Sequence, residues 1–149
     1  KSGFMMASAI DSISGSHDHK DSARSVMILC EVYSMILQGR SKFYIEAYLK
    51  THYPIPDELV KFEKLDATCQ GTLPFVLRCF LNSNSTHEAI LTAVKYGGDT
   101  DTNASIAGEL ANAYYKDISY EDVKFVHKHL NRHQLKTLQA FNTLIREKI

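Results

Sequence analysis

The residues KYGGDTDTNASIAG, at positions 95–108, place two carboxylates and two hydroxyls directly ahead of a run of small side chains. Asp99 and Asp101 are two positions apart, and Thr102 follows at once. Carboxylate and hydroxyl oxygens are ligands that hard ions such as Mg²⁺, Mn²⁺ or Ca²⁺ prefer. Two carboxylates about 4 Å apart repel by ~4 kcal/mol at an effective dielectric constant near 20, and a bound cation removes that cost. The segment therefore predicts a divalent metal site.

Two glycines precede the aspartates and support a ligand site. Gly97 and Gly98 can adopt backbone angles that are closed to other residues, and they let a ligand approach the main chain closely. The helix that follows should point its first N–H groups to the same place, which favours an anionic group such as phosphate. The alternative is a helix boundary alone, in which Gly97 ends one helix and an aspartate or threonine caps the next. Both interpretations stay open here, because the same residues can start a helix and face a cation.

The elements that position these residues are all expected to be helical. Apolar residues recur at helical spacing, and Gly and Pro fall between the periodic segments rather than inside alternating runs. Helices are expected over residues 21–38, 41–49, 71–81, 88–96, 103–115, 119–130 and 134–149, with a short amphipathic piece at 57–65. Residues 1–20 carry only a weak helical signal. The sequence predicts an all-α protein of about seven helices, arranged as an orthogonal bundle.

Several helix boundaries are predicted from their local chemistry. Gly39 should stop the first strong helix, and Ser41 should cap the next. Pro74 is expected in the first turn of its helix, where a missing N–H is tolerated. A capping box is expected at Ser85 with Glu88, and Ser119 with Asp122 should open another helix. The small residues of 103–115 should let a neighbouring helix pack close; they are Ala104, Ser105, Ala107, Gly108, Ala111 and Ala113.

Composition and charge narrow the classes of function. The chain has 149 residues, 44% of them hydrophobic and 23% charged, which is a globular balance. Lys plus Arg equals Asp plus Glu at 17 each, so no nucleic-acid partner is expected. The most apolar stretch, at 25–37, contains a glutamate and is too short to span a bilayer, so no membrane partner is expected. Three cysteines in sparse positions favour a reducing compartment, and we expect a cytoplasmic protein.

Other residue pairs have competing interpretations. His17, His19 and Asp21 match the H-x-H-x-D start of a zinc motif, but that motif needs a further histidine and a preceding strand. A polar loop with Asp21 as the helix cap is the simpler interpretation. His129 and His133 are four apart, but Asn131-Arg132 favours a helix break between them. Cys30 and Cys79 fall on apolar helix faces and should be core residues. Tyr114 and Tyr115 should pack in the core, although a nucleotide pocket is the alternative.

The stretch EAILTAVKYGGDTDTNASIAGELANAYY, at 88–115, resembles the C-terminal signature of the ADP-ribosylglycohydrolase family. In that family a G-G-D-x-D-T segment precedes a helix rich in small residues. The resemblance extends upstream through GTLPFVLRCFLNSNSTHEAI and more weakly to SGSHDHKDSARSVMILCEVYSMILQG. It therefore covers residues from about 15 to 116.

The resemblance implies an all-α hydrolase of the bond between ADP-ribose and an acceptor, with two Mg²⁺ or Mn²⁺ ions beside the ribose. By position, Asp99, Asp101 and Thr102 resemble the C-terminal metal ligands, and Asp101 the aspartate that contacts both ions. His17 is similar to the histidine near the diphosphate or ribose, and Gly97 and Gly98 would adjoin the ligand. The implied partners are ADP-ribosylated proteins or small molecules that contain ADP-ribose.

The chain departs from the family pattern in two respects. The family completes its cage with a T-D-D segment and a glutamate from the N-terminal half of the domain, and these 149 residues contain no T-D-D. Asn112 and Lys116 replace glycines, and Glu109 replaces a small residue. We therefore expect either a single all-helical domain or the C-terminal half of a larger one, incomplete on its N-terminal side.

Two functions follow as hypotheses. The first is the C-terminal part of a Mg²⁺-dependent ADP-ribosyl hydrolase, inactive as this chain alone unless a separate N-terminal half or partner chain supplies the missing carboxylates. The second is a non-catalytic helical module that binds a partner.

Overall fold

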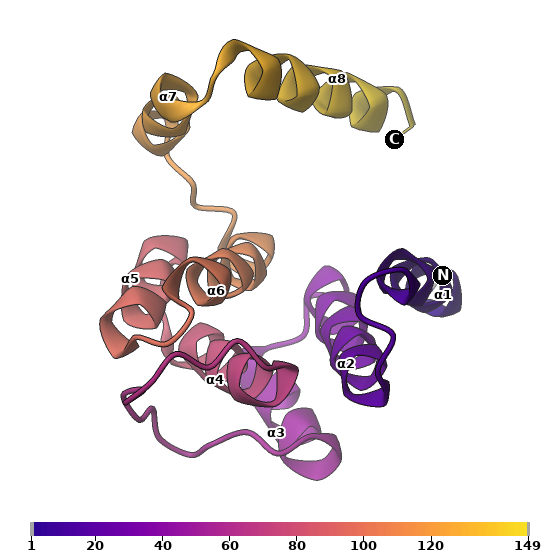
Figure 1. The fold of residues 1–149 in the computed structure, drawn as a ribbon, viewed down its shortest axis with the longest axis vertical. Coiled ribbons are helices and arrows are strands. Elements are labelled where there is room, and N and C mark those ends of the chain that lie inside the picture. The colour runs from indigo at the N-terminus through magenta and orange to yellow at the C-terminus, as the bar shows by residue number, and fades with distance from the viewer. Residues whose placement is uncertain (1, 149) are drawn as a thin grey trace. The chain divides into compact units, whose positions relative to one another are not determined.

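A computed structural model describes residues 2–148 of the chain and the side chains of residues 5–145. These residues form eight α-helices and no strand, so the predicted all-α class is confirmed. The helices are α1 (Ser2–Ser14), α2 (Lys20–Leu37), α3 (Lys42–His52), α4 (Cys69–Asn82), α5 (Thr86–Tyr96), α6 (Thr100–Tyr115), α7 (Tyr120–His129) and α8 (Arg132–Lys148). The chain divides into two compact units, with α1 to α6 in residues 1–117 and α7 and α8 in residues 118–149 (Figure 1). None of the described helices combines the length and the apolar character needed to cross a bilayer.

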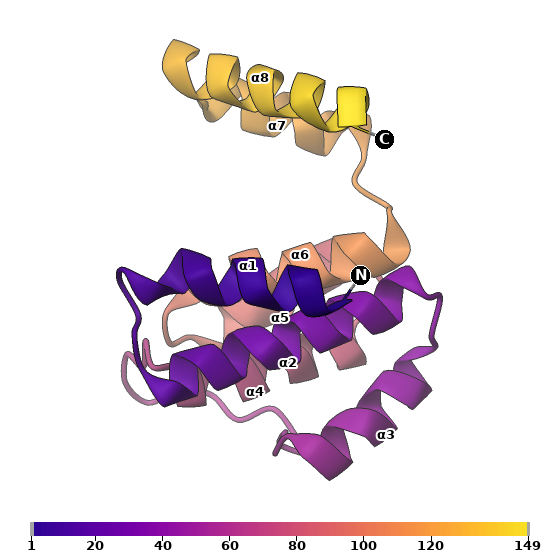
Figure 2. The ribbon, with the colours of Figure 1, turned by 90° about the vertical axis from the view of Figure 1, so that its right-hand side faces the viewer.

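Helix α4 carries much of the core of the first unit. Its fully or almost fully buried side chains are Leu73, Val76, Leu77, Cys79 and Phe80. Helices α2, α5 and α6 contact it, and α1 runs along α2 (Figure 2). Helix α3 adds Ile45 and Leu49, neither of which has exposed surface. Because burying one such side chain stabilises a fold by ~1.5–3 kcal/mol, this core accounts for the compactness of the unit.

Helices α5 and α6 approach each other closely, as the small residues of α6 predict. A Cβ atom added at Gly108 would lie 2.7 Å from Cγ1 of Ile90 on α5, which is closer than real contacts allow. Ala107 and Ala111 have no exposed surface. The small side chains therefore set the distance between the two helices that flank the predicted metal segment.

Most predicted helix ends are confirmed. Gly39 has a φ of 70° and follows the end of α2. The Ser41 hydroxyl accepts the Tyr44 N–H at 3.3 Å. Ser119 and Asp122 form the complete capping box at the start of α7. The capping box predicted at Ser85 is half formed, because Glu88 accepts the N–H of Asn84 at 2.6 Å rather than that of Ser85.

Three local predictions are wrong. Residues 57–65 form no helix and belong to an irregular segment, residues 53–68, between α3 and α4. Val60 and Leu65 are 76% and 74% exposed there, so the expected apolar face has nothing to pack against. Helix α4 begins earlier, at Cys69, and Pro74 therefore lies in its second turn rather than its first.

The starts of α1 and α2 also differ from expectation. Helix α1 forms where the sequence gives only a weak signal. Helix α2 begins one residue earlier than expected, so His19 rather than Asp21 is its N-cap, and its Nδ1 accepts the Asp21 N–H at 3.2 Å. The helix is therefore capped by an imidazole nitrogen of His19 and not by the Asp21 carboxylate that the sequence predicts.

The second unit consists of two amphipathic helices without a buried core. None of the described side chains from 118 to 145 is buried, and only Leu130 and Leu135 are half-buried. The side-chain oxygen of Asn131 accepts the N–H groups of His133 and Gln134 at 2.9 and 3.0 Å and so caps the start of α8. The predicted helix break is therefore confirmed, and His129 and His133 belong to different helices.

Candidate functional site

The turn between α5 and α6 depends on its two glycines. Gly97 and Gly98 have φ values of 86° and 75°, in the left-handed region where a Cβ atom is strained. Gly97 caps the end of α5 and donates its N–H to the Val94 carbonyl at 3.3 Å. The chain can therefore end one helix and start the next within three residues.

Two side chains lie against this turn. A Cβ atom at Gly98 would lie 3.0 Å from two ring carbons of Phe62 and 3.3 Å from Nδ2 of Asn103. That amide nitrogen donates to the Gly97 carbonyl at 3.3 Å. Phe62 is also tied to the end of α5 through its N–H, which donates to the Tyr96 carbonyl at 2.9 Å. The glycine at position 98 is therefore needed both for its backbone angle and for the space that these neighbours take.

Asp99 and Asp101 present adjacent carboxyl groups at the start of α6. A hydrogen bond between the two side chains lowers the pKa of Asp101, and the Thr102 N–H, 3.0 Å from Oδ1, lowers it further. Asp99 holds the N-cap position but makes no side-chain cap bond. The cap alternative therefore describes the position of Asp99 but not its carboxyl, which pairs with that of Asp101 rather than with an N–H of α6.

The donor set at the start of α6 fits one hard cation better than two. Asp99, Asp101 and Thr102 bring oxygen atoms only, and Mg²⁺ typically takes one or two carboxylates and keeps several waters. Among the residues whose side chains the structure describes, 5–145, no three or more His, Cys, Asp and Glu residues form a group that could hold a metal ion. A cage for two ions needs further carboxylates that these residues do not bring to this place.

His17 lies in the exposed turn between α1 and α2. Its Nδ1 is 2.8 Å from the Ser16 hydroxyl, and its N–H donates to the Ile13 carbonyl at 2.7 Å. No hydrogen bond or ion pair in the described part of the chain joins His17 to Asp99, Asp101 or Thr102. The structure thus places the carboxyls of Asp99 and Asp101 next to each other at the start of α6 and leaves His17 in a separate turn.

The H-x-H-x-D segment forms a helix start rather than a zinc cluster. His19 caps α2, and the Asp21 carboxylate lies 3.4 Å from its Nδ1. The same oxygen, Oδ2, also accepts the side-chain amide of Gln70 on α4 at 2.6 Å. His19 and Asp21 therefore make contacts typical of a helix start.

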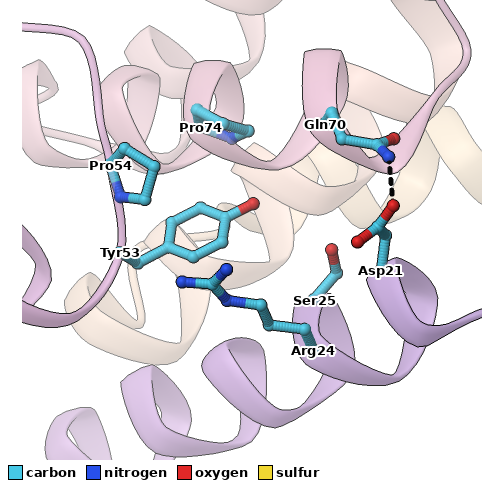
Figure 3. A pocket seen from close by; sticks show the side chains of 7 residues that line it. All are labelled: Asp21, Arg24, Ser25, Tyr53, Pro54, Gln70 and Pro74. Atoms are coloured by element: carbon cyan, nitrogen blue, oxygen red, sulfur yellow. Dashed lines mark hydrogen bonds between the residues drawn. The ribbon is translucent and has the colours of Figure 1, made fainter.

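A small pocket opens between the start of α2, the end of α3 and the start of α4 (Figure 3). Its accessible volume is about 140 Å³, and its lining residues are Asp21, Arg24, Ser25, Tyr53, Pro54, Gln70 and Pro74. The Arg24 guanidinium lies over the Tyr53 ring, 5.6 Å from its centre. Pockets for drug-sized ligands and cofactors usually measure about 300–1,000 Å³, so this one is too small to enclose a dinucleotide.

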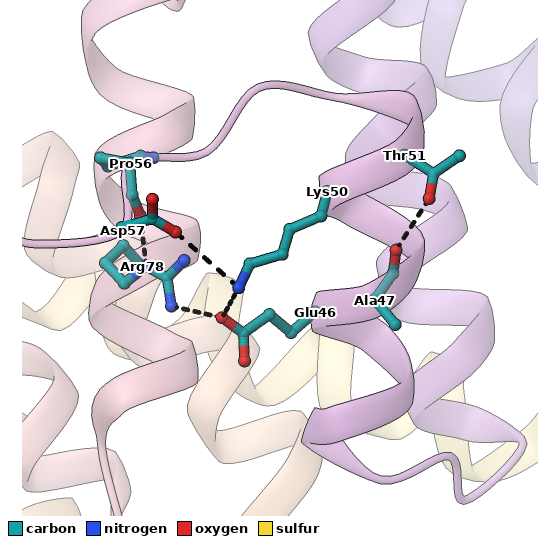
Figure 4. A network of polar contacts seen from close by, with 7 residues as sticks. All are labelled: Glu46, Ala47, Lys50, Thr51, Pro56, Asp57 and Arg78. Atoms are coloured by element: carbon teal, nitrogen blue, oxygen red, sulfur yellow. Dashed lines mark hydrogen bonds and ion pairs between the residues drawn. The ribbon is translucent and has the colours of Figure 1, made fainter.

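A buried arginine ties the start of the irregular segment to α3 and α4 (Figure 4). Nε of Arg78 donates to the Pro56 carbonyl at 2.6 Å, and Nη1 lies 2.8 Å from the Glu46 carboxylate. Lys50 lies 3.2 Å from the same carboxylate and 3.8 Å from that of Asp57. The segment is therefore fixed at Pro56 and again at Phe62, against the glycine turn.

Phe62 and Asn103 are the residues of this site that the sequence did not single out. Phe62 comes from a segment expected to be helical, and nothing in its neighbours indicates a contact with residues 35 positions away. Asn103 lies in the segment 88–115 that resembles the family signature, where an asparagine after D-T-D-T looks like one more polar residue at a helix start. It has no exposed surface, which only the packing reveals.

Other residue predictions are confirmed by burial. Cys30 and Cys79 are buried, and all three cysteines are free. Burial raises the pKa of the Cys79 thiol to about 12, so it is no nucleophile at neutral pH. The Tyr114 ring meets Phe80 edge-on at 5.7 Å, and the Tyr115 hydroxyl donates to the Ser83 carbonyl at 2.5 Å.

Comparison with known proteins gives a match to one family model. No curated protein and no solved structure gives a significant match. The sequence model of the ADP-ribosylglycohydrolase family matches residues 4–119, more than three quarters of the chain. The match spans the helices around the glycine turn and ends near the boundary of the first unit. The chain therefore belongs to the ADP-ribosylglycohydrolase family.

Proposed function

We propose that the chain carries the C-terminal part of a metal-dependent site that hydrolyses the bond between ADP-ribose and an acceptor. The observation that carries this proposal is the pair of carboxyls at the start of α6. They lie side by side, and Asp99 makes no cap bond. A helix start needs only one capping side chain, whereas a second carboxyl beside the first offers a divalent cation a further oxygen ligand.

In this proposal Asp99, Asp101 and Thr102 hold Mg²⁺ or Mn²⁺ by their side-chain oxygens. Such an ion polarises a substrate oxygen and lowers the pKa of bound water. Gly97 and Gly98, which lack side chains, leave room for the ligand next to the main chain. The first N–H groups of α6 face the same region and favour a phosphate group, and His17 contacts the diphosphate or the ribose.

We further propose that the chain by itself hydrolyses its substrate little or not at all. Three oxygen-bearing side chains do not hold two ions, and the described residues bring no third carboxylate to them. An N-terminal half or a partner chain would supply the missing acidic ligands. The substrates are ADP-ribosylated proteins or small molecules that contain ADP-ribose, and the three free thiols favour a cytoplasmic location.

Titration with Mn²⁺ tests the metal part of this proposal. We expect one ion to bind to the full chain, as followed by the loss of the free Mn²⁺ signal in electron paramagnetic resonance. Asp101→Asn should abolish that binding, whereas Asp117→Asn, just beyond the C-terminal end of α6, should leave it unchanged if its fold is kept. Equal binding by wild type and Asp101→Asn would contradict the proposal.

Release of ADP-ribose tests the catalytic part. The chain alone should release little from an ADP-ribosylated protein in the presence of Mg²⁺. Addition of a polypeptide that contains the family's T-D-D segment should restore release, and Asp101→Asn should remove it again. Full metal-dependent release by the chain alone would show that the site is complete without a partner.

A non-catalytic binding module is the second candidate, and the lack of a three-residue metal cluster within residues 2–148 favours it. Such a module would bind ADP-ribose equally well with and without Mg²⁺. Calorimetry of ADP-ribose binding in the presence of Mg²⁺ or a chelator separates the two candidates.

A further inference from the structure

Asn103 is a polar side chain placed in the core directly below the glycine turn. Its residue has no exposed surface. Nδ2 donates to the Gly97 carbonyl at 3.3 Å, while Oδ1 is buried and has no hydrogen-bond partner. Buried polar atoms are nearly always paired, so an unpaired one within a functional segment needs an explanation.

Asn103 contacts the main chain on both sides of Gly98. Its backbone N–H donates to the Asp99 carbonyl at 2.8 Å, and its side chain reaches back to Gly97. Asn103 is therefore hydrogen-bonded to the carbonyls of both neighbours of Gly98, to that of Gly97 through its side chain and to that of Asp99 through its backbone. Phe62 closes the other side of the same glycine.

We infer that Asn103 is a positioning residue, which holds the glycine turn so that Asp99 and Asp101 can share one cation. Its Oδ1, which has no hydrogen-bond partner, is available to accept an N–H of the turn when a cation is bound. The inference rests on the proposed metal site, since it assigns Asn103 a role in the geometry of that site. It explains why an amide, and not an aliphatic side chain, lies in this apolar place.

The test compares Asn103→Leu with wild type in the full chain. Leucine has a similar size; it removes the unpaired oxygen but also the donor to the Gly97 carbonyl, so the two effects oppose each other and the urea midpoint without metal should change little. Mn²⁺ affinity should fall by about tenfold to a hundredfold, as for other residues that orient metal ligands. Amide exchange at Gly98, followed by nuclear magnetic resonance without metal, should become faster. A purely structural role would instead move affinity and stability together.

The control is Asn112→Leu, at a half-buried position on the same helix, which should leave Mn²⁺ affinity and Gly98 exchange unchanged. Asn103→Ser replaces the leucine variant if the latter does not fold. Wild-type affinity together with unchanged exchange at Gly98 would overturn the inference. If wild type itself binds no Mn²⁺, the metal part of the proposed function fails, and Gly98 exchange alone decides whether Asn103 holds the turn.

Discussion

Gly98 meets two separate requirements at one residue. Its φ of 75° is strained for any residue with a Cβ atom, and two ring carbons of Phe62 lie only 3.0 Å from where that atom would be. Gly39 has a similar φ of 70°, but a Cβ atom there would meet nothing within 4 Å. The chain thus contains a matched pair that separates backbone strain from steric overlap.

The expected result is that Gly98→Ala destabilises the fold more than Gly39→Ala. Each substitution should cost ~1–2 kcal/mol for the left-handed backbone. Gly98→Ala should cost a further ~1–3 kcal/mol, because Phe62 must move. Urea unfolding of both variants measures the difference. Adding Phe62→Leu to Gly98→Ala should recover part of the second cost and none of the first, and equal losses in both alanine variants would refute this account of Gly98.

Arg78 gives a second prediction at this scale. Its side chain is 5% exposed and depends on the Glu46 carboxylate, which is 30% exposed. Glu46→Gln should lower the free energy of unfolding by ~1–3 kcal/mol, since a buried cation loses its charged partner. Asp57→Asn is the control, because that carboxylate is exposed and 3.8 Å from Lys50, and it should change stability little.

The pH dependence of the same pair follows from its hydrogen bonds. The Arg78 guanidinium, helped by Lys50, lowers the pKa of Glu46 below its ordinary value of 4.5. The stabilisation is therefore complete above that value and is lost as the pH falls through the lowered pKa. Wild type and Glu46→Gln should converge in stability at low pH, and a constant difference down to acid unfolding would contradict the assignment.

Single residues could be predicted from sequence where their chemistry is local. The oxygen-rich D-T-D-T segment and the two glycines before it can be recognised from composition alone. The structure places them in the turn before α6 and in its first residues. Phe62 could not be predicted, because its role comes from packing against a turn remote in sequence. Asn103 could not be predicted either, since burial and not residue type gives it importance.

At the scale of elements, Lys116 is an unusual end for α6. It has a φ of 56° and a ψ of 39°, and among residues 2–148 it is the one non-glycine residue with positive φ. Glycine adopts this left-handed conformation at no steric cost. Lys116→Gly should therefore raise the free energy of unfolding by ~0.5–1 kcal/mol. Lys95→Gly, inside α5, should lower it by ~1 kcal/mol, which shows that the gain belongs to the position.

Lys42 joins α3 to the end of α4. Its ammonium donates to the carbonyls of Phe80 at 2.7 Å, Leu81 at 3.3 Å and Ser83, and lies over three aromatic rings. Burial lowers its pKa from 10.5 to about 8, with Glu88 opposing the shift. An unfolded lysine keeps its proton up to about pH 10.5, so unfolding takes up a proton between pH 8 and 10.5.

Raising the pH through that window should therefore stabilise wild type relative to Lys42→Met. Urea midpoints of both proteins between pH 7.5 and 10.5 measure the difference, and the tyrosines cancel because both proteins share them. A stability difference that stays constant or shrinks with rising pH would mean that the carbonyl oxygens stabilise the charged ammonium of Lys42 more than burial destabilises it.

Element boundaries were predictable where a cap or a glycine sets them locally, as at Gly39, Ser41 and Ser119. The amphipathic pattern of residues 57–65 misled because a helix needs a partner for its apolar face, and Val60 and Leu65 have none. Pro54 and Pro56 already favour an extended chain there. The hydrogen bonds that fix the segment run from its backbone to Arg78 and Tyr96, and sequence periodicity carries no record of them.

At the scale of the molecule, the two units differ in what holds them together. The buried side chains of the described residues all belong to residues 1–117, and the family match covers nearly the same range. We therefore expect a chain that ends at Asp117 to fold and to keep the thermal midpoint of the full chain. Circular dichroism during heating measures both, and loss of cooperative unfolding would show that residues 118–149 are needed for the core of the first unit.

The irregular segment between α3 and α4 is as constrained as the helices beside it. It is tied at Pro56 to a buried arginine and at Phe62 to the glycine turn, with five residues between these two anchors. Insertions or deletions between the anchors should alter the placement of the carboxylates without touching them. Natural variation in length is therefore expected to spare this stretch, and a protease cut within it should loosen the grip on any bound cation before the helices unfold.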